Sequence, residues 1–155
     1  MNYPLLAGFR ENVLGRGFIA SVAINGRALA VQEDERRWWI YGVNPGAIAA
    51  SGSTLLEAHA SLLRTFRSYL ADVAQEANDF AEFKSEVERF FEQCDPDTLR
   101  EWEEAHAAVR AGRVTFDQLP RVVILGKPPL EVQVIEIRPS PERNAIEEAA
   151  PRMAA

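Results

Sequence analysis

The sequence predicts an α+β fold in which a small antiparallel sheet carries one long helix on a face. Three observations lead to this prediction. Residues 18–50 contain short apolar runs that alternate with a period of two, as half-buried strands do. At residue 54 the apolar period changes to about 3.6, the period of an amphipathic helix. A strand-like run at 130–138 is expected to add the last strand, and the stretch 76–120 before it is expected to be a helical insertion.

The first strands are expected to form a meander. Proline and glycines interrupt residues 1–16, and we expect an arm without regular structure there. Two strands at 18–24 and 27–32 should be joined by a hairpin turn at Asn25-Gly26, because both residue types tolerate positive φ. A third strand is expected at 37–43, where aromatic side chains are dense.

A turn and a short edge strand should follow the third strand. Asn44-Pro45-Gly46 combines three residue types that favour turns. Residues 47–50 are small and apolar, and we expect a short fourth strand or its edge there. The sheet should therefore contain three to four N-terminal strands plus the C-terminal strand, in a single domain at 1–138.

The long helix is expected from Thr54 to about Gln75. Thr54 and Glu57 have the spacing of a capping box, which satisfies free backbone N–H groups at a helix start. The expected apolar stripe consists of Leu55, His59, Leu62, Leu63, Phe66, Leu70 and Val73. Because this stripe repeats at helical spacing, the helix should pack on the sheet.

Two shorter helices are expected in the insertion. One should begin after Asp79, a typical N-cap residue, and end near Gln93. The next should begin at Asp95-Pro96, because an N-cap residue followed by proline favours a helix start. Gly112 suits the C-terminal cap of that helix.

The end of the chain predicts strands and a tail. Residues 121–125 are β-like and precede a proline-containing break. In the last strand both faces are apolar, which indicates an internal strand or pairing with a second chain. Residues 139–155 combine prolines, charges and alanines, and we expect a disordered tail there.

The charge distribution indicates which partners the chain could bind. The formal net charge is −6, and residues 76–112 hold four basic and eleven acidic side chains, a net charge of −7. Such a chain is a poor general binder of nucleic acid, because that affinity comes largely from Lys and Arg. The acidic stretch could bind a basic protein. The alternative is that it is the solvated side of two surface helices, as most charge runs are.

The composition also favours a cytoplasmic location. No apolar run approaches the roughly 18 residues that a membrane helix needs, so no membrane association is expected. Residues 1–17 lack the basic and apolar stretches of a secretory signal. The single cysteine, Cys94, cannot form an internal disulfide.

Few residues could supply catalytic chemistry. His59 and His106 each fall in a helix stripe, and neither has a neighbour at metal-ligand spacing. Cys94 precedes a helix start, but the acidic side chains beside it disfavour a reactive thiolate. We therefore expect no catalytic residue, no cofactor and no metal site. A small enzyme that uses His59 or Cys94 is the least favoured alternative.

Trp38-Trp39 is the most unusual dipeptide in the chain. Consecutive strand residues point to opposite faces, so one Trp should face the helices and the other solvent or a partner. Tryptophan is enriched where proteins bind each other, but the chain's own helices could also cover both rings. The candidate partner-binding residues are Trp38, Trp39, Tyr41, Glu101, Glu103 and Glu104.

Three short sequences resemble the HicB-like antitoxins, over about residues 27–75 and 121–138. They are the aromatic strand WWIYGV at 38–43, the turn NPG at 44–46 and the helix start GSTLLEA at 52–58. In addition, KPP at 127–129, followed by the strand-like run 130–137, resembles the proline-containing lead into the last strand of the family. The family shows an aromatic strand, a Leu-Pro-Gly turn and the helix start Gly-Asp-Thr-Leu-Glu-Glu-Ala.

The differences from the family pattern are specific. Asn44 stands where the family has Leu, Ser53 where it has Asp, and Leu56 where it has the first Glu. The helical stretch 76–120 is an insertion relative to the family. The sequence after Arg138 contains no recognisable DNA-binding module, so DNA binding is not expected.

The resemblance implies a non-catalytic antitoxin that binds a small basic ribonuclease toxin and blocks its active site. It also implies a homo-oligomer that associates through the sheet domain. The alternative is a standalone oligomeric protein-binding or scaffold domain without a toxin.

Overall fold

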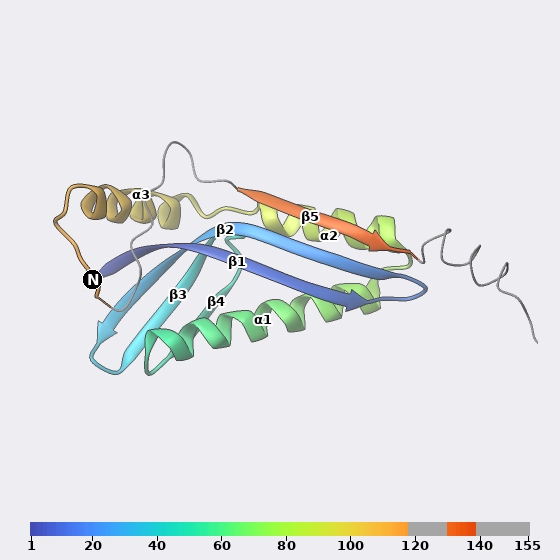
Figure 1. The fold of residues 1–155 in the computed structure, drawn as a ribbon, viewed down its shortest axis with the longest axis horizontal. Helices are drawn as coiled ribbons and strands as arrows, with labels where there is room; N and C mark the ends of the chain where they lie inside the picture. Colours follow the sequence, from blue (N-terminus) through green and yellow to red (C-terminus); the bar gives the residue numbers. More distant parts are fainter. Residues whose placement is uncertain (118–129, 139–155) are drawn as a thin grey trace, which may run out of the picture.

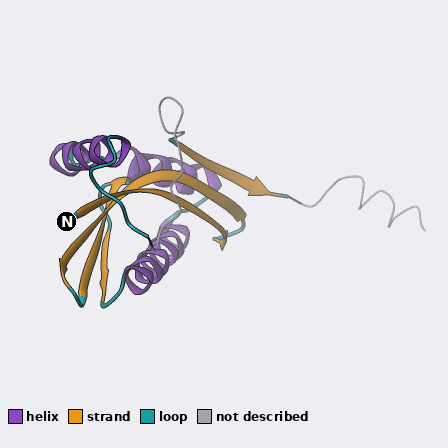
Figure 2. Ribbon diagram, turned by 60° about the vertical axis from the view of Figure 1, so that its left-hand side comes forward, coloured by secondary structure: helices purple, strands orange, loops and turns teal. Residues whose placement is uncertain are grey.

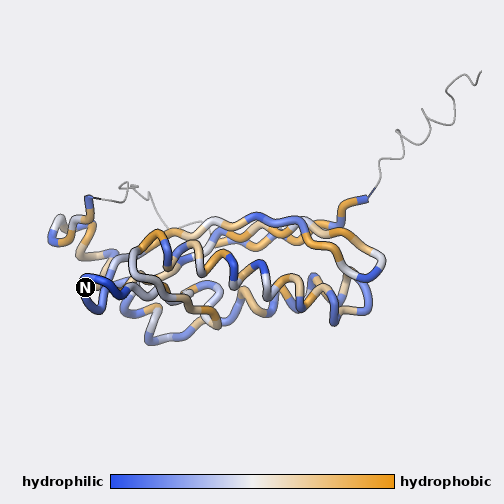
Figure 3. Tube along the Cα trace, turned by 90° about the horizontal axis from the view of Figure 1, so that it is seen from below, coloured by the Kyte–Doolittle hydropathy of each residue, from blue (hydrophilic) through white to orange (hydrophobic). Residues whose placement is uncertain are grey.

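The computed structural model describes residues 1–117 and 130–138, and it confirms the α+β fold. Five strands form one antiparallel sheet, and three helices lie between the fourth and fifth strands. The elements are β1 (Asn2–Leu14), β2 (Ile19–Asp34), β3 (Arg37–Asn44), β4 (Ala49–Gly52), α1 (Leu55–Glu76), α2 (Phe80–Glu92), α3 (Pro96–Arg110) and β5 (Glu131–Ile137). The molecule is elongated, with α1 running alongside the sheet (Figure 3).

Strand β2 organises the sheet because it pairs along its whole length. On one side it pairs with β1. On the other side it pairs first with β5, from Ile19 to Asn25, and then with β3, from Arg27 to Asp34. We call these two parts the β5 end and the β3 end of the sheet. Figure 1 shows the β3 end near the N-terminus and β5 toward the opposite end of the molecule.

The expectation of an arm at residues 1–16 is wrong, because these residues form β1. Tyr3, Phe9 and Val13 alternate toward the core and are buried. The proline that suggested a break, Pro4, lies in an edge strand, where a missing backbone N–H is tolerated. The period-two pattern was therefore a better guide than the proline and glycines.

The expected hairpin at Asn25-Gly26 is also wrong, because β2 continues through both residues. A Cβ at Gly26 would lie 1.9 Å from the carbonyl oxygen of Asn44. The register between β2 and β3 shifts at the next step, between Arg27 and Ala28. Glycine is therefore required for close approach of β3 at an irregularity in the strand, and a turn is not formed.

The predicted third and fourth strands and the three helices are present. Thr54 Oγ1 accepts a hydrogen bond from the Glu57 backbone N–H at 3.1 Å, and the Glu57 carboxylate accepts one from the Ser53 N–H at 2.9 Å. Asp79 caps α2 with the same pair of hydrogen bonds, and Asp95 caps α3 by accepting a hydrogen bond from the Thr98 backbone N–H at 3.1 Å. Gly112 follows α3 with a φ of 73°, the left-handed conformation expected after a helix.

Helices α1 and α2 cover one face of the sheet, which we call the α1/α2 face. Phe66 of α1 stacks on Phe9 of β1, with ring centroids 5.3 Å apart. The ring centroid of Phe83 in α2 lies 5.4 Å from that of Phe18, which precedes β2. Four residues of the predicted stripe of α1 are buried: Leu55, Leu62, Phe66 and Leu70. Leu63 and Val73 are half-buried and His59 is exposed, whereas Ala58 and Ala74 are buried although they were not predicted.

Helix α3 packs on the opposite face, which we call the α3 face, and covers its β3 end. Trp102 and Ala105 pack there against Leu29 and Val43. The indole N–H of Trp102 donates to the backbone oxygen of Leu5 at 3.2 Å. Within residues 1–117 and 130–138, no helix covers the β5 end of this face. Figure 2 shows β5 extending away from α3.

Strand β5 pairs with β2 on one side only, as far as the structure describes the chain. Both expectations for this strand, an internal position and pairing with a second chain, therefore stay predictions. The β-like run at 121–125 and the tail at 139–155 lie outside the described residues.

Candidate functional site

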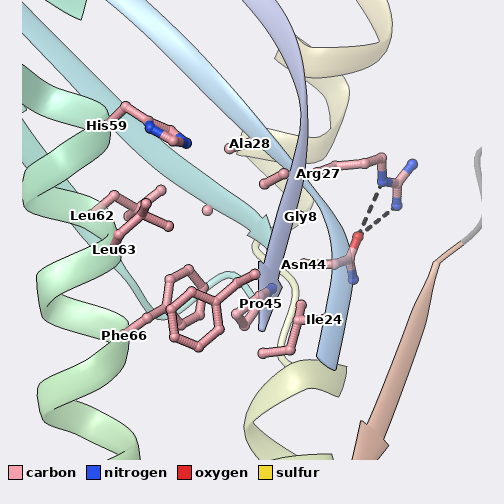
Figure 4. Close-up of a pocket in the computed structure, with 13 residues that line it drawn as sticks. Gly8, Ile24, Arg27, Ala28, Asn44, Pro45, His59, Leu62, Leu63 and Phe66 are labelled. Carbon is pink, nitrogen blue, oxygen red and sulfur yellow. Dashed lines mark hydrogen bonds between the residues drawn. The ribbon is translucent and has the colours of Figure 1, made fainter. Parts of the chain in front are cut away.

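A small hollow lies between α1 and the sheet, at the point where β2 passes from its β5 end to its β3 end (Figure 4). Leu62, Leu63 and Phe66 of α1 form its apolar wall. Its volume is about 10 Å³, which is about the space that one water molecule requires. A metabolite would not fit in this hollow as it stands.

The predicted chemistry-bearing residues lie in different surroundings. His59 is exposed at the rim of the hollow. The His106 ring lies 4.9 Å from the Trp102 ring, and burial together with nearby Arg110 lowers the pKa of His106. Cys94 is half-buried between α2 and α3. In the described part of the chain, no three His, Cys, Asp or Glu side chains form a group that could hold a metal ion. The absence of catalysis stays a prediction.

The two tryptophans take different roles. Trp38 is only 5% exposed and packs between Tyr3 and Phe116, with ring centroids 5.7 and 5.5 Å away. Trp38 therefore belongs to the core, and its assignment as a partner-binding residue is corrected. Trp39 points to the α3 face, is half-buried, and stacks on Tyr41 at 5.8 Å with an interplanar angle of 12°.

The carboxylates of Glu101, Glu103 and Glu104 are exposed on α3. None of the three forms an ion pair with another described residue, whereas Asp97 on the same helix pairs with Arg100 at 3.1 Å. On α2, Glu86 pairs with Arg89 at 2.7 Å, which lowers the pKa of Glu86. Other acids of the described residues, such as Glu82 and Glu92 on α2, also form no ion pair, but α3 carries three such carboxylates within four residues.

The aromatic pair lies on the face of the sheet that is covered by α3, the helix that carries these carboxylates. Trp39 is the cross-strand neighbour of Val31. Val31 in turn packs against the cluster that contains Trp102 of α3. We call the set formed by Trp39, Tyr41, Glu101, Glu103 and Glu104 the acidic–aromatic surface.

A second exposed surface was missed in the sequence. It consists of Leu14, Ile19, Ile135 and Ile137, which we call the β5-end patch. Eight large apolar side chains are exposed in the described residues, and these four lie together, 42% to 75% exposed. The sequence indicated two of these residues, Ile135 and Ile137, because both faces of the last strand are apolar. Leu14 was hidden because residues 1–16 were expected to lack structure.

In the described residues, the fold is a small α+β domain with one sheet face covered by two helices and the other covered by α3 at its β3 end. Comparisons with protein-family models, curated proteins and solved structures found no match to this chain. Similarity to the HicB-like antitoxins therefore stays a prediction from the sequence. None of the described helices is long and apolar enough to cross a membrane.

Proposed function

We propose that this chain is a non-catalytic protein-binding domain whose partner is a basic protein. The acidic–aromatic surface is the observation that supports this proposal most strongly. Its three carboxylates have no cationic partner among residues 1–117 and 130–138. The aromatic pair beside α3 adds a flat, half-exposed apolar area, which is typical of binding hot spots.

The more specific form of the proposal is a cytoplasmic HicB-like antitoxin that binds a small basic ribonuclease toxin. The sequence resemblance at 38–58 supports it, as does the order β3, β4, α1 of the elements that carry that sequence. An acidic helix that binds the basic side chains of a ribonuclease's substrate site would exclude RNA, because the same side chains bind its phosphates. Helices α2 and α3 would then be the part that distinguishes this chain from the family pattern.

The alternative is a standalone oligomeric domain without a toxin. The β5-end patch favours this alternative, because exposed apolar side chains that cluster commonly mark contacts between proteins. The two proposals use different ends of the α3 face and can be tested separately.

A pull-down with the tagged full chain from its native cells tests the proposal. At low salt the chain should retain a stoichiometric basic protein, identified by mass spectrometry, and added salt should release it because exposed charge pairs are screened. Retention of no basic protein, or of one that salt does not release, would contradict binding through the carboxylates of α3.

A further inference from the structure

The β5 end of the α3 face is an open three-stranded surface with an ordered arrangement of side chains. The pairing of β1 with β2 and of β2 with β5 sets Leu14, Ile19 and Ile137 in one row across the strands. Ile135 lies in the next row, and Arg10 and Glu131 lie farther along β1 and β5. The apolar residues are thus at one end of the surface, and the charges are at the other.

The central strand of this surface carries small side chains, so the middle of the surface is low. β2 contributes Ser21 and Ala23 between the flanking strands. On the α1/α2 face, the same strands contribute Val13, Val22 and Val134, which are all buried. Helices therefore cover the α1/α2 face of these strands. Within the described chain, no element covers their α3 face.

We propose that the β5-end patch is the interface between two copies of this chain, packed face to face about a two-fold axis parallel to β2. Two sheets pack in this way about 10 Å apart. A two-fold axis along the strands keeps each row opposite the same row of the other copy and sets β1 over β5. Leu14 then faces Ile137 of the second copy, and Ile19 faces Ile19.

Charge complementarity favours a second copy of the chain as the partner and a two-fold axis parallel to β2. With β1 over β5, the guanidinium of Arg10 faces the β5 segment that carries Glu131 of the second copy, about two residues or 7 Å farther along the strand. The long side chain of arginine can span that offset. A two-fold axis across the strands would instead set β1 over β1 and gather Arg10 and Arg16 of both copies. The axis along the strands therefore joins opposite charges and buries the apolar row against itself.

The molecular mass in solution tests the interface directly. Over increasing concentration, sedimentation velocity of the full chain should show a shift from 17.3 kDa to twice that mass. Ile135→Lys should weaken the dimer at least about tenfold, because it places a charge in the apolar contact. Leu56→Lys is the matched control, since Leu56 is 78% exposed on α1 and lies outside the patch. Circular dichroism should show both variants folded.

Two results would overturn the interface. One is a wild-type chain that stays monomeric at all concentrations, which would show that the patch does not bind a second copy of the chain. The other is a dimer that Ile135→Lys and Leu56→Lys affect equally. Neither result bears on binding of a basic protein by the acidic–aromatic surface, because the inference does not rest on that proposal.

Charge reversal tests the orientation. With β1 over β5, Arg10 of each copy lies near Glu131 of the other. Arg10→Glu should therefore weaken the dimer, and the double variant Arg10→Glu and Glu131→Arg should restore it. With an axis across the strands, Arg10 would face positive charge of the second copy, and Arg10→Glu would strengthen the dimer. Strengthening by Arg10→Glu alone would overturn the proposed axis.

Discussion

Phe66 joins the sheet to the two helices that cover it. Its ring lies 5.3 Å from that of Phe9 in β1 and 6.4 Å, edge to face, from that of Phe90 in α2. Aromatic pairs in these geometries contribute beyond the area they bury. The side chain is 4% exposed, so its removal leaves a space that its neighbours cannot easily fill.

Phe66→Ala should therefore lower the free energy of unfolding by about 3–5 kcal/mol. Leu56→Ala, on the exposed side of the same helix, should change it by less than about 0.5 kcal/mol. Chemical denaturation of both variants makes the comparison. A loss for Phe66→Ala no larger than that of Leu56→Ala would contradict the packing of α1 on the sheet.

Gly26 is the residue where β2 needs the absence of a side chain. Gly26→Ala forces a Cβ toward the Asn44 carbonyl oxygen, and we expect a loss of about 1–3 kcal/mol in the free energy of unfolding. Gly8→Ala is the control, because its Cβ would meet only the Asn25 side chain at an ordinary 3.9 Å. Equal stability of the two variants would show that β3 does not approach β2 as closely as the structure indicates.

Helices are the elements that the sequence predicts best in this chain. Thr54, Asp79 and Asp95 each cap the helix that follows them, and the structure starts the three helices at the next residue. A cap is a local signal, since the cap residue and its bonding partner are three positions apart. The sequence therefore contains enough information to place these helix starts.

Strands are predicted less well because their bounds depend on neighbours far along the chain. Asn25-Gly26 has the sequence of a hairpin turn, yet β1 pairs with both residues and β5 pairs with Asn25, so β2 continues as one strand. The acidic–aromatic surface was partly predictable, since α3 could be recognised as a helix with outward carboxylates. The β5-end patch was not, because it depends on the pairing of β1 and β5 with β2.

The caps also predict how stability changes with pH. Hydrogen bonds from the hydroxyl and backbone N–H of Thr98 lower the pKa of Asp95, and bonds from Ser53 lower that of Glu57. A carboxylate whose pKa is lower in the folded state stabilises the fold above its ordinary pKa near 4. This contribution is lost as the pH falls through the lower, folded-state pKa.

Thermal unfolding followed from about pH 6 to about pH 2 checks this expectation. Asp95→Asn keeps an acceptor at the cap of α3 but removes the titrating proton. Its melting temperature should therefore fall less steeply with acid than that of the wild type. A variant with the same pH dependence as the wild type would exclude Asp95 as a source of acid sensitivity.

At the scale of the whole molecule, the two faces of the sheet are covered differently. The α1/α2 face is covered at both ends, whereas α3 covers the β3 end of the opposite face. That opposite face carries the acidic–aromatic surface at one end and the β5-end patch at the other. The two surfaces share no residue, so the dimer and the binding of a basic protein are separate proposals about one face.

The central claim is that the carboxylates of α3 bind a basic protein. The most direct test is the dissociation constant of the basic protein recovered from the pull-down, measured by calorimetry for three forms of the chain. The forms are the wild type, the triple variant Glu101→Gln, Glu103→Gln and Glu104→Gln, and a charge-matched control, Glu35→Gln, Asp72→Asn and Glu76→Gln, in which exposed acids elsewhere are neutralised. We expect about tenfold weaker binding, roughly 1.4 kcal/mol, for the α3 variant and little change for the control. Equal weakening of both variants would show a response to net charge alone and would contradict a binding site on α3.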